Sequence, residues 1–189
     1  MRIIVAGIVG GIVMFFWGFV SHMALGVGEA GIKTLPDAKE APIVAAMKAN
    51  ISEPGLYFVP GMDMSRKSTD EEWAAWTSKY EAGPTAFLVY SPVGETPMSP
   101  KQLGVEFASN VLAALVGAFM LSWTVPSLGK RVVLATLIGL AAWLSINVSY
   151  WDWYRFPAAF VSSELIEQVA GWFLSGLAMG LVLKQKPIA

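Results

Sequence analysis

The chain has 189 residues, of which 55% are hydrophobic and 14% are charged, and its formal net charge is −1. Soluble domains carry about 25% charged residues, so this composition argues against an ordinary soluble domain, and the small net charge argues against a nucleic-acid partner. The absence of Cys excludes disulfides, thiolate metal sites and Cys nucleophiles.

Four long apolar stretches are the most informative pattern in the chain. They cover residues 3–25, 107–125, 132–151 and 165–183. Each approaches the about 20 residues that an α-helix needs to cross the hydrocarbon core of a bilayer. The sequence therefore predicts an all-α membrane fold, a four-helix transmembrane bundle with a small α/β extracytoplasmic insertion between the first and second helices. The predicted transmembrane helices are residues 1–25, 100–126, 131–151 and 163–184, and the insertion is residues 26–99.

The first apolar stretch has an alternative interpretation as a cleaved signal peptide, because the basic residue Arg2 precedes an apolar centre. Its length exceeds the apolar region of a typical signal peptide, and no clear A-x-A cleavage site follows it. We therefore expect residues 1–25 to remain in the protein as a transmembrane helix.

Basic residues next to the apolar stretches lie on one side of the predicted membrane. Arg2 precedes the first stretch, Lys130 and Arg131 connect the second to the third, and Lys184 and Lys186 follow the fourth. The positive-inside rule places all of these residues, and therefore both termini, in the cytoplasm. The sequence predicts a multi-pass protein of the cell (inner) membrane whose insertion is outside, in the periplasm.

The insertion is too long for an unstructured loop, so we expect it to have its own secondary structure. Pro42 is suited to the first position of a short helix that ends near Asn50. Residues 56–59 and 85–90 are short apolar runs with Gly or Pro nearby, which indicates strands. Residues 68–81 are predicted to form a second helix between these strands.

The helix predicted over residues 68–81 has a clear start signal and an aromatic face. Thr69 can cap its first turn, with Glu72 three residues later as in a capping box. Trp73, Trp76 and Tyr80 share one face at helical spacing. This face is expected to pack into the core of the insertion, and the alternative is contact with a partner or with the lipid surface.

Three of the predicted transmembrane helices contain pairs of small residues four positions apart. The pairs are Gly7 and Gly11, Ala113 and Gly117, and Gly176 and Gly180. This spacing lets two helices approach closely. The pairs therefore mark either contacts between helices of the same chain or the face of a homo-oligomer.

Two serines have the position of helix N-caps. Ser99 precedes Pro100 and stands three residues before Gln102, a pattern typical of a helix start. Ser163 is the predicted N-cap of the fourth transmembrane helix.

A layer of polar residues is predicted near the outer boundary of the membrane. Counting about twenty residues outward from each cytoplasmic end brings polar side chains from all four helices to a similar depth. The candidate ligand-binding residues in this layer are His22, Glu106, Asn110, Asn147, Glu164, Glu167 and Gln168. Ionisable groups at such depth usually face other helices, where they pair or bind a ligand.

The polar layer supports several kinds of chemistry. His22, Glu106 and Glu167 could together hold a divalent metal, because imidazole and carboxylate groups are ligands for Zn, Mn or Fe. The same residues could relay protons or hold a polar head group. Alternatively, the acidic residues are only structural, since the first turn of a helix favours negative charge. No cofactor is predicted, and the divalent metal stays an open alternative.

The sequence contains no catalytic or nucleotide-binding motif of the common kinds, so no motif in it indicates an enzyme. The favoured hypothesis is a non-enzymatic anchor or interaction protein that presents the insertion to a protein partner. The alternative is a sensor or transport-type protein that binds a ligand, lipid or metal in the polar layer. A membrane enzyme that uses His22 with Glu106 or Glu167 is the third hypothesis. The expected partners are membrane lipid and a further protein or a second copy, and no nucleic acid.

Overall fold

The computed structural model describes residues 1–124 and 127–183 of the chain. The basic residues Lys184 and Lys186, and residues 125–126 at the end of the second predicted helix, lie outside these described ranges. The described chain forms two compact units. We call Met1–Ile32 together with the segment from Pro97 the helical unit, and we call Lys33–Thr96 the insertion unit.

Within the described residues, four helices are long and apolar enough to cross a membrane. They are α1 (Arg2–Phe19), which continues as the π-helical turn η1 (Val20–Leu25), then α4 (Pro100–Thr124), α5 (Leu128–Tyr154) and α6 (Ala158–Val182). Large apolar side chains such as Leu112, Trp123 and Leu181 face outward on these helices. Long apolar helices that expose such side chains are typical of a multi-pass membrane protein.

The helix boundaries differ from the sequence prediction at α5 and α6. Ser127 caps α5, where the backbone N–H of Lys130 donates to its hydroxyl oxygen at 3.4 Å, so α5 begins three residues before position 131. The predicted N-cap role of Ser163 is wrong, because α6 begins at Ala158 and Ser163 lies inside it. Pro157 precedes the first turn, and its fixed φ suits a helix start.

The predicted start of α4 is confirmed. The backbone N–H of Ser99 donates to the side-chain oxygen of Gln102 at 3.1 Å. The backbone N–H of Gln102 donates to the Ser99 hydroxyl at 3.3 Å. This reciprocal pair satisfies two of the donors that a helix start leaves open.

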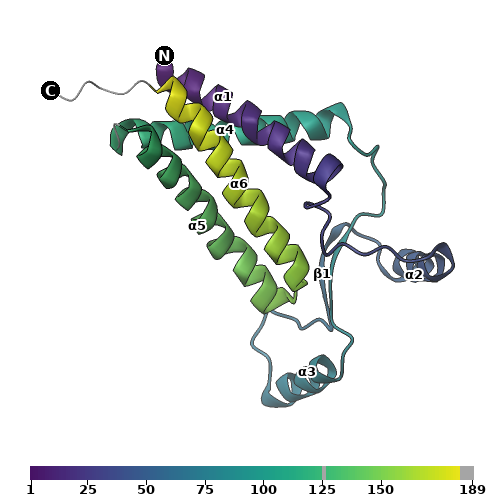
Figure 1. Cartoon of the computed structure of the whole chain (residues 1–189). Helices are drawn as coiled ribbons and strands as arrows, with labels where there is room; N and C mark the ends of the chain where they lie inside the picture. The colour runs from purple at the N-terminus through teal and green to yellow at the C-terminus, as the bar shows by residue number, and fades with distance from the viewer. Residues whose placement is uncertain (125–126, 184–189) are drawn as a thin grey trace. The chain divides into compact units, whose positions relative to one another are not determined.

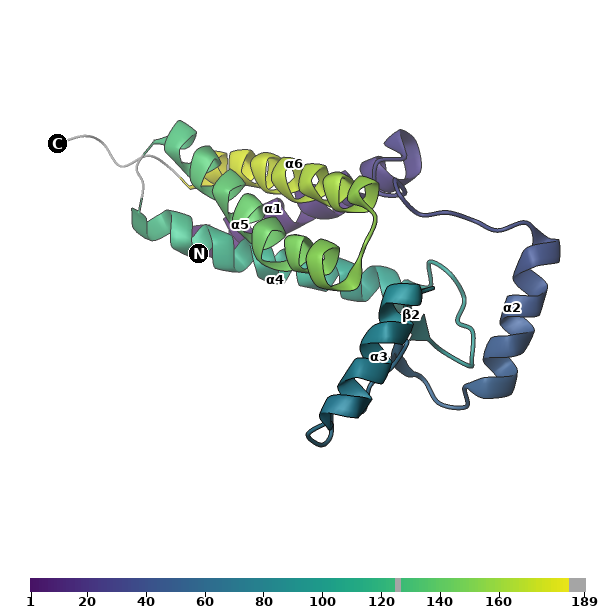
Figure 2. The same ribbon diagram turned by 90° about the horizontal axis from the view of Figure 1, so that it is seen from below.

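In the helical unit, α1 packs along both α4 and α6, and α5 packs along α6 (Figures 1 and 2). The glycine pairs make these approaches possible. A Cβ at Gly7 would lie 2.7 Å from the Cα of Leu115 on α4, and a Cβ at Gly11 would overlap the backbone of Val111. A Cβ at Gly176 would overlap the side chain of Ala135 on α5. These contacts support the interpretation of the small-residue pairs as packing within one chain.

Arg131 is buried, although the sequence predicts that it lies in a cytoplasmic connection between two transmembrane helices. Only 5% of the residue is exposed. Its guanidinium group donates to the backbone carbonyls of Gly180, at 3.4 Å, and of Leu183. These carbonyls lie at the C-terminal end of α6, where the helix dipole favours a positive charge. Arg131 therefore fastens the start of α5 to the end of α6.

The insertion unit contains α2 (Asp37–Asn50), β1 (Gly55–Val59), α3 (Asp70–Ala82) and β2 (Ala86–Tyr90). In the described part of the chain, β1 and β2 form an antiparallel two-stranded sheet. The order helix, strand, helix, strand is as the sequence predicts. The predicted start of the first helix is wrong, because α2 begins at Asp37 after Pro36 and contains Pro42 in its interior.

The helix α3 packs its aromatic face on the sheet. The Tyr80 ring stacks on Phe58 of β1 with ring centroids 6.0 Å apart. The indole N–H of Trp76 donates to the carbonyl of Pro60 at 3.0 Å. At its other end, α3 has the predicted capping box of Thr69 and Glu72. Trp76 and Tyr80 are therefore half-buried against the sheet as expected, whereas the expectation is wrong for Trp73, which is 55% exposed.

Candidate functional site

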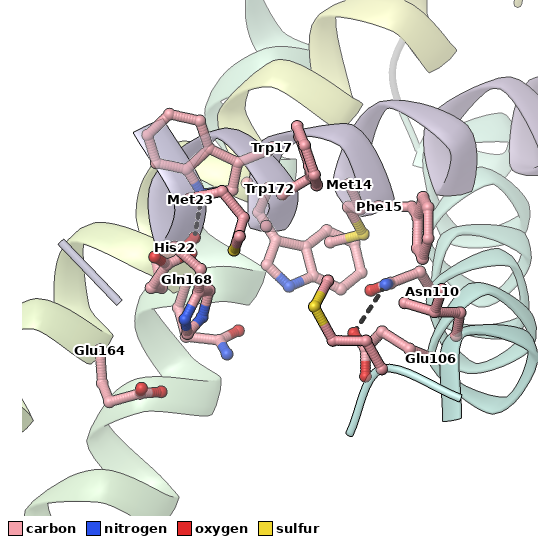
Figure 3. Close-up of a pocket in the computed structure, with 16 residues that line it drawn as sticks. Met14, Phe15, Trp17, His22, Met23, Glu106, Asn110, Glu164, Gln168 and Trp172 are labelled. Carbon is pink, nitrogen blue, oxygen red and sulfur yellow. Dashed lines mark hydrogen bonds between the residues drawn. The ribbon is translucent and has the colours of Figure 1, made fainter. Parts of the chain in front are cut away.

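A cavity of about 390 Å³ lies within the helical unit, among α1, α4 and α6 (Figure 3). Cavities of about 300–1,000 Å³ are the usual size of small-molecule sites. The polar residues that line it are His22, Glu106, Asn110, Glu164, Glu167 and Gln168. Six of the seven candidates from the sequence thus line one cavity. The seventh, Asn147, is buried on α5 and is not one of the lining residues.

The α1 side of the cavity is shaped by the π-helical turn η1. Gly26 ends this turn with φ of 63°, a left-handed conformation that glycine adopts without strain. The His22 ring lies on Gly28, where a Cβ would overlap it, and His22 Nδ1 is 3.2 Å from the carboxylate of Glu29. Single π-helical turns are frequent at functional sites. Here the wider turn places His22 at the rim of the cavity.

The α4 side presents Glu106 and Asn110, which lie one turn apart on the same face. The amide nitrogen of Asn110 donates to the Glu106 carboxylate at 2.8 Å. This bond orients the carboxylate, which projects into the cavity (Figure 3). Glu106 is largely exposed rather than packed in the protein interior.

The α6 side contributes Glu164, Glu167 and Gln168, all half-buried. The hydroxyl of Ser21 donates to the carboxylate of Glu167. The indole N–H of Trp17 donates to the backbone carbonyl of Glu167 at 3.2 Å. Two bonds, one from η1 and one from α1, therefore fix the position of Glu167, whereas Glu164 borders the cavity at its other edge.

The inner surface of the cavity is apolar, and Trp172 is its central element. The residue is 8% exposed. A Cβ at Gly117 of α4 would lie 2.8 Å from the Trp172 ring, and so would a Cβ at Gly139 of α5. Both neighbouring helices thus hold the ring against the cavity. Trp17 and Met14 add further apolar lining from α1.

Sequence reasoning missed the apolar half of the site, although a signal was present. Gln168 and Trp172 are four residues apart, as are Met14 and Gly18, so each pair shares a helix face. Trp172 lies one turn inward from Gln168, and Gly18 and Met14 lie one and two turns inward from His22, so extending the polar positions inward would have found these residues. Counting residues outward along each helix selected polar side chains alone, so it identified only the residues at the rim of the cavity.

The separation of the acidic groups bears on the metal hypothesis. Glu106 and Glu164 lie on opposite sides of the cavity (Figure 3). Among the described residues, no three His, Asp or Glu side chains are grouped closely enough to hold one metal ion. The site of His22, Glu106 and Glu167 for a divalent metal stays a prediction.

Comparison with known proteins adds no functional assignment. The chain matches no protein-family model, and no curated protein or solved structure is significantly similar to it.

Proposed function

We propose that this integral membrane protein is a non-enzymatic binding protein whose cavity among α1, α4 and α6 holds an amphipathic ligand. The observation that carries the proposal is the meeting of a polar rim with an apolar floor. Glu106 and Glu164 stand at the rim, and Trp172 forms the floor. A pocket with few polar groups over an apolar surface is typical of a ligand site.

The proposed location is the cell (inner) membrane, with both termini in the cytoplasm and the insertion unit in the periplasm. Figure 1 supports a common side for the basic residues Arg2 and Lys130, because α1 and α5 begin at the same end of the helical unit. The cavity residues lie toward the opposite ends of α1, α4 and α6, near the expected outer boundary of the membrane. The ligand would therefore enter from the outer leaflet or from the periplasm.

A filled cavity tests the proposal. Gly18 lines the cavity, and a Cβ there meets no atom within 4 Å. The Gly18→Leu side chain should therefore occupy ligand space without displacing the backbone. Gly104→Leu is the matched control, because a Cβ at Gly104 also meets no atom and Gly104 is not one of the lining residues.

The measurement is native mass spectrometry of protein extracted from membranes in a mild detergent. We expect the wild type and the Gly104→Leu variant to retain a bound amphiphile and the Gly18→Leu variant to lose it. Equal retention by all three proteins, or no retention by the wild type, would contradict the proposal.

A second candidate function is the presentation of the insertion unit to a protein partner. Leu56 and Val89 are directly paired across the two strands, and they are 62% and 78% exposed. Adjacent exposed apolar side chains can mark an interaction surface. A photocrosslinking residue at position 89 should then give a specific adduct in cells, whereas one at the exposed Glu40 should not. Identical patterns at both positions would count against this function.

A further inference from the structure

The charge of the cavity lining points to the chemical class of the ligand. The ionisable lining residues are three carboxylic acids, Glu106, Glu164 and Glu167, and one imidazole, His22. No Lys or Arg is found among the described residues that line this cavity. The acidic side chains thus outnumber the imidazole by three to one. A cleft lined by one sign of charge concentrates ligands of the opposite sign, so the cavity favours a cation.

The aromatic and thioether lining favours an organic cation. Trp17 and Trp172 border the same space as the carboxylates (Figure 3). Indole rings attract ammonium groups through their faces. Met14 and Met23 add flexible apolar side chains that adapt to a hydrocarbon chain. These neighbours suit a ligand that combines positive charge with apolar surface.

The number of acceptors at the rim favours a primary ammonium. Glu106 lies on one side of the cavity, and Glu164 and the amide of Gln168 lie on the other (Figure 3). A primary ammonium has three N–H donors, so it can bond a carboxylate and still donate to a neighbouring amide or to water. Hydrogen bonds between an ammonium and a carboxylate are about twice as strong as neutral ones.

Resting on the proposed function, the geometry points to an amphipathic primary amine as the ligand, which we propose binds with its ammonium at the acidic rim that contains Glu106 and Glu164 and with its chain over Trp172. Two sources can supply this chemistry, an aminolipid of the bilayer or a free long-chain amine. The carboxylate of Glu167, which accepts from Ser21, supports the rim and is left unchanged in the test.

The experiment uses the full chain in nanodiscs of phosphatidylcholine, titrated with dodecylamine and with dodecanol by isothermal calorimetry. The two probes have the same chain, and only the amine carries charge. We expect the amine to bind about tenfold or more tightly than the alcohol. Glu106→Gln and Glu164→Gln should each weaken amine binding by about tenfold and alcohol binding by a clearly smaller factor. Glu81→Gln, an exposed carboxylate of α3, is the control and should change neither.

The source of the amine is decided by replacing part of the nanodisc lipid. Phosphatidylethanolamine should compete with dodecylamine if the ligand is an aminolipid, and phosphatidylglycerol should not. Amine binding that phosphatidylethanolamine leaves unchanged would assign the site to a free amine, which also supports the proposal.

Three outcomes are distinguishable in this experiment. Equal affinity of wild-type protein for the amine and the alcohol would overturn the amine assignment and leave the binding proposal standing, and this comparison needs no variant to fold. Amine affinity that is the same in wild type, Glu106→Gln and Glu164→Gln would also overturn it. Absence of binding by both probes, together with absence of a retained amphiphile after extraction, would overturn both proposals.

Discussion

The hydroxyl of Ser21 donates a hydrogen bond to the carboxylate of Glu167, and this bond joins the π-helical turn η1 to α6. Ser21 is fully buried, and Glu167 is half-buried at the edge of the cavity. The helix α1, which η1 continues, also contacts Glu167: the indole N–H of Trp17 donates to its backbone carbonyl. The contact fixes one wall of the candidate site.

Ser21→Ala should destabilise the helical unit modestly. The change removes the donor to a half-buried carboxylate, and such bonds in membrane proteins contribute about 0.5–2 kcal/mol. The measurement is the midpoint of unfolding as sodium dodecyl sulfate is added to protein in mild detergent. Ser145→Ala is the control, because the exposed Ser145 donates within its own helix to Ala142. Equal midpoints for the two variants would count against a stabilising role of the Ser21 bond.

Gly11→Leu should separate α1 from α4. A side chain at this position overlaps the backbone of Val111, so the helices must move apart. Overpacking of this kind costs at least about 2 kcal/mol. The same unfolding titration measures the loss, with Gly104→Leu as the control. If Gly11→Leu instead kept full stability and changed only the oligomeric state, the glycine pair would belong to an interface between copies.

Arg131→Met should lower the stability of the helical unit, because it weakens the contact between the start of α5 and the end of α6. The substitution leaves the carbonyls of Gly180 and Leu183 without their guanidinium donor, at an expected cost of about 1–3 kcal/mol. Lys130→Met removes the same charge from an exposed neighbouring position and should cost little. Comparable losses in unfolding midpoint for both variants would show that charge rather than the buried bonds matters.

The carboxylate of Glu72 gives the insertion unit a defined response to acid. Hydrogen bonds from Arg66 and from the Thr69 backbone lower the pKa of Glu72 from 4.5 to about 2. Because the folded pKa is depressed, this contribution to stability is complete above the unfolded pKa of 4.5. It is lost progressively as the pH falls from 4.5 toward 2.

Arg66→Gln should raise the pKa of Glu72, because it removes the first cause of the depression. The measurement is an NMR titration of ¹³C-labelled Glu carboxyl groups, with the Glu72 signal assigned by Glu72→Gln. Lys79→Gln, which removes a charge from the far end of α3, is the control. A Glu72 signal that titrates at the same pH with and without Arg66 would refute this cause.

The absence of Cys permits a direct test of topology with single introduced thiols. In intact cells a membrane-impermeant maleimide should label the Glu40→Cys variant, because α2 belongs to the predicted periplasmic insertion. It should label the Gly129→Cys variant only after the membrane is permeabilised. Labelling in the reverse order would place the insertion unit in the cytosol.

Several local features could be predicted from the sequence because neighbouring residues decide them. The four long helices follow from apolar length, and the capping boxes at Ser99 and Thr69 follow from residues three positions apart. The start of α6 was predicted too late, because Ser163 was interpreted as its N-cap, whereas the helix begins at Ala158 after Pro157. The π-helical turn around His22 was not predicted, since no simple residue pattern marks it.

By itself, the sequence determined the four long apolar helices and their approximate bounds and predicted a common depth for their polar residues, because hydropathy and charge act along the chain. Only the tertiary structure decided which of these residues share a space. It brought Glu106 and Glu164 to one cavity, left Asn147 outside its lining and supplied Trp172 as the floor. Equal depth leaves the rotation of each helix open, and close contacts such as Gly11 on Val111 and Gly176 on Ala135 set that rotation.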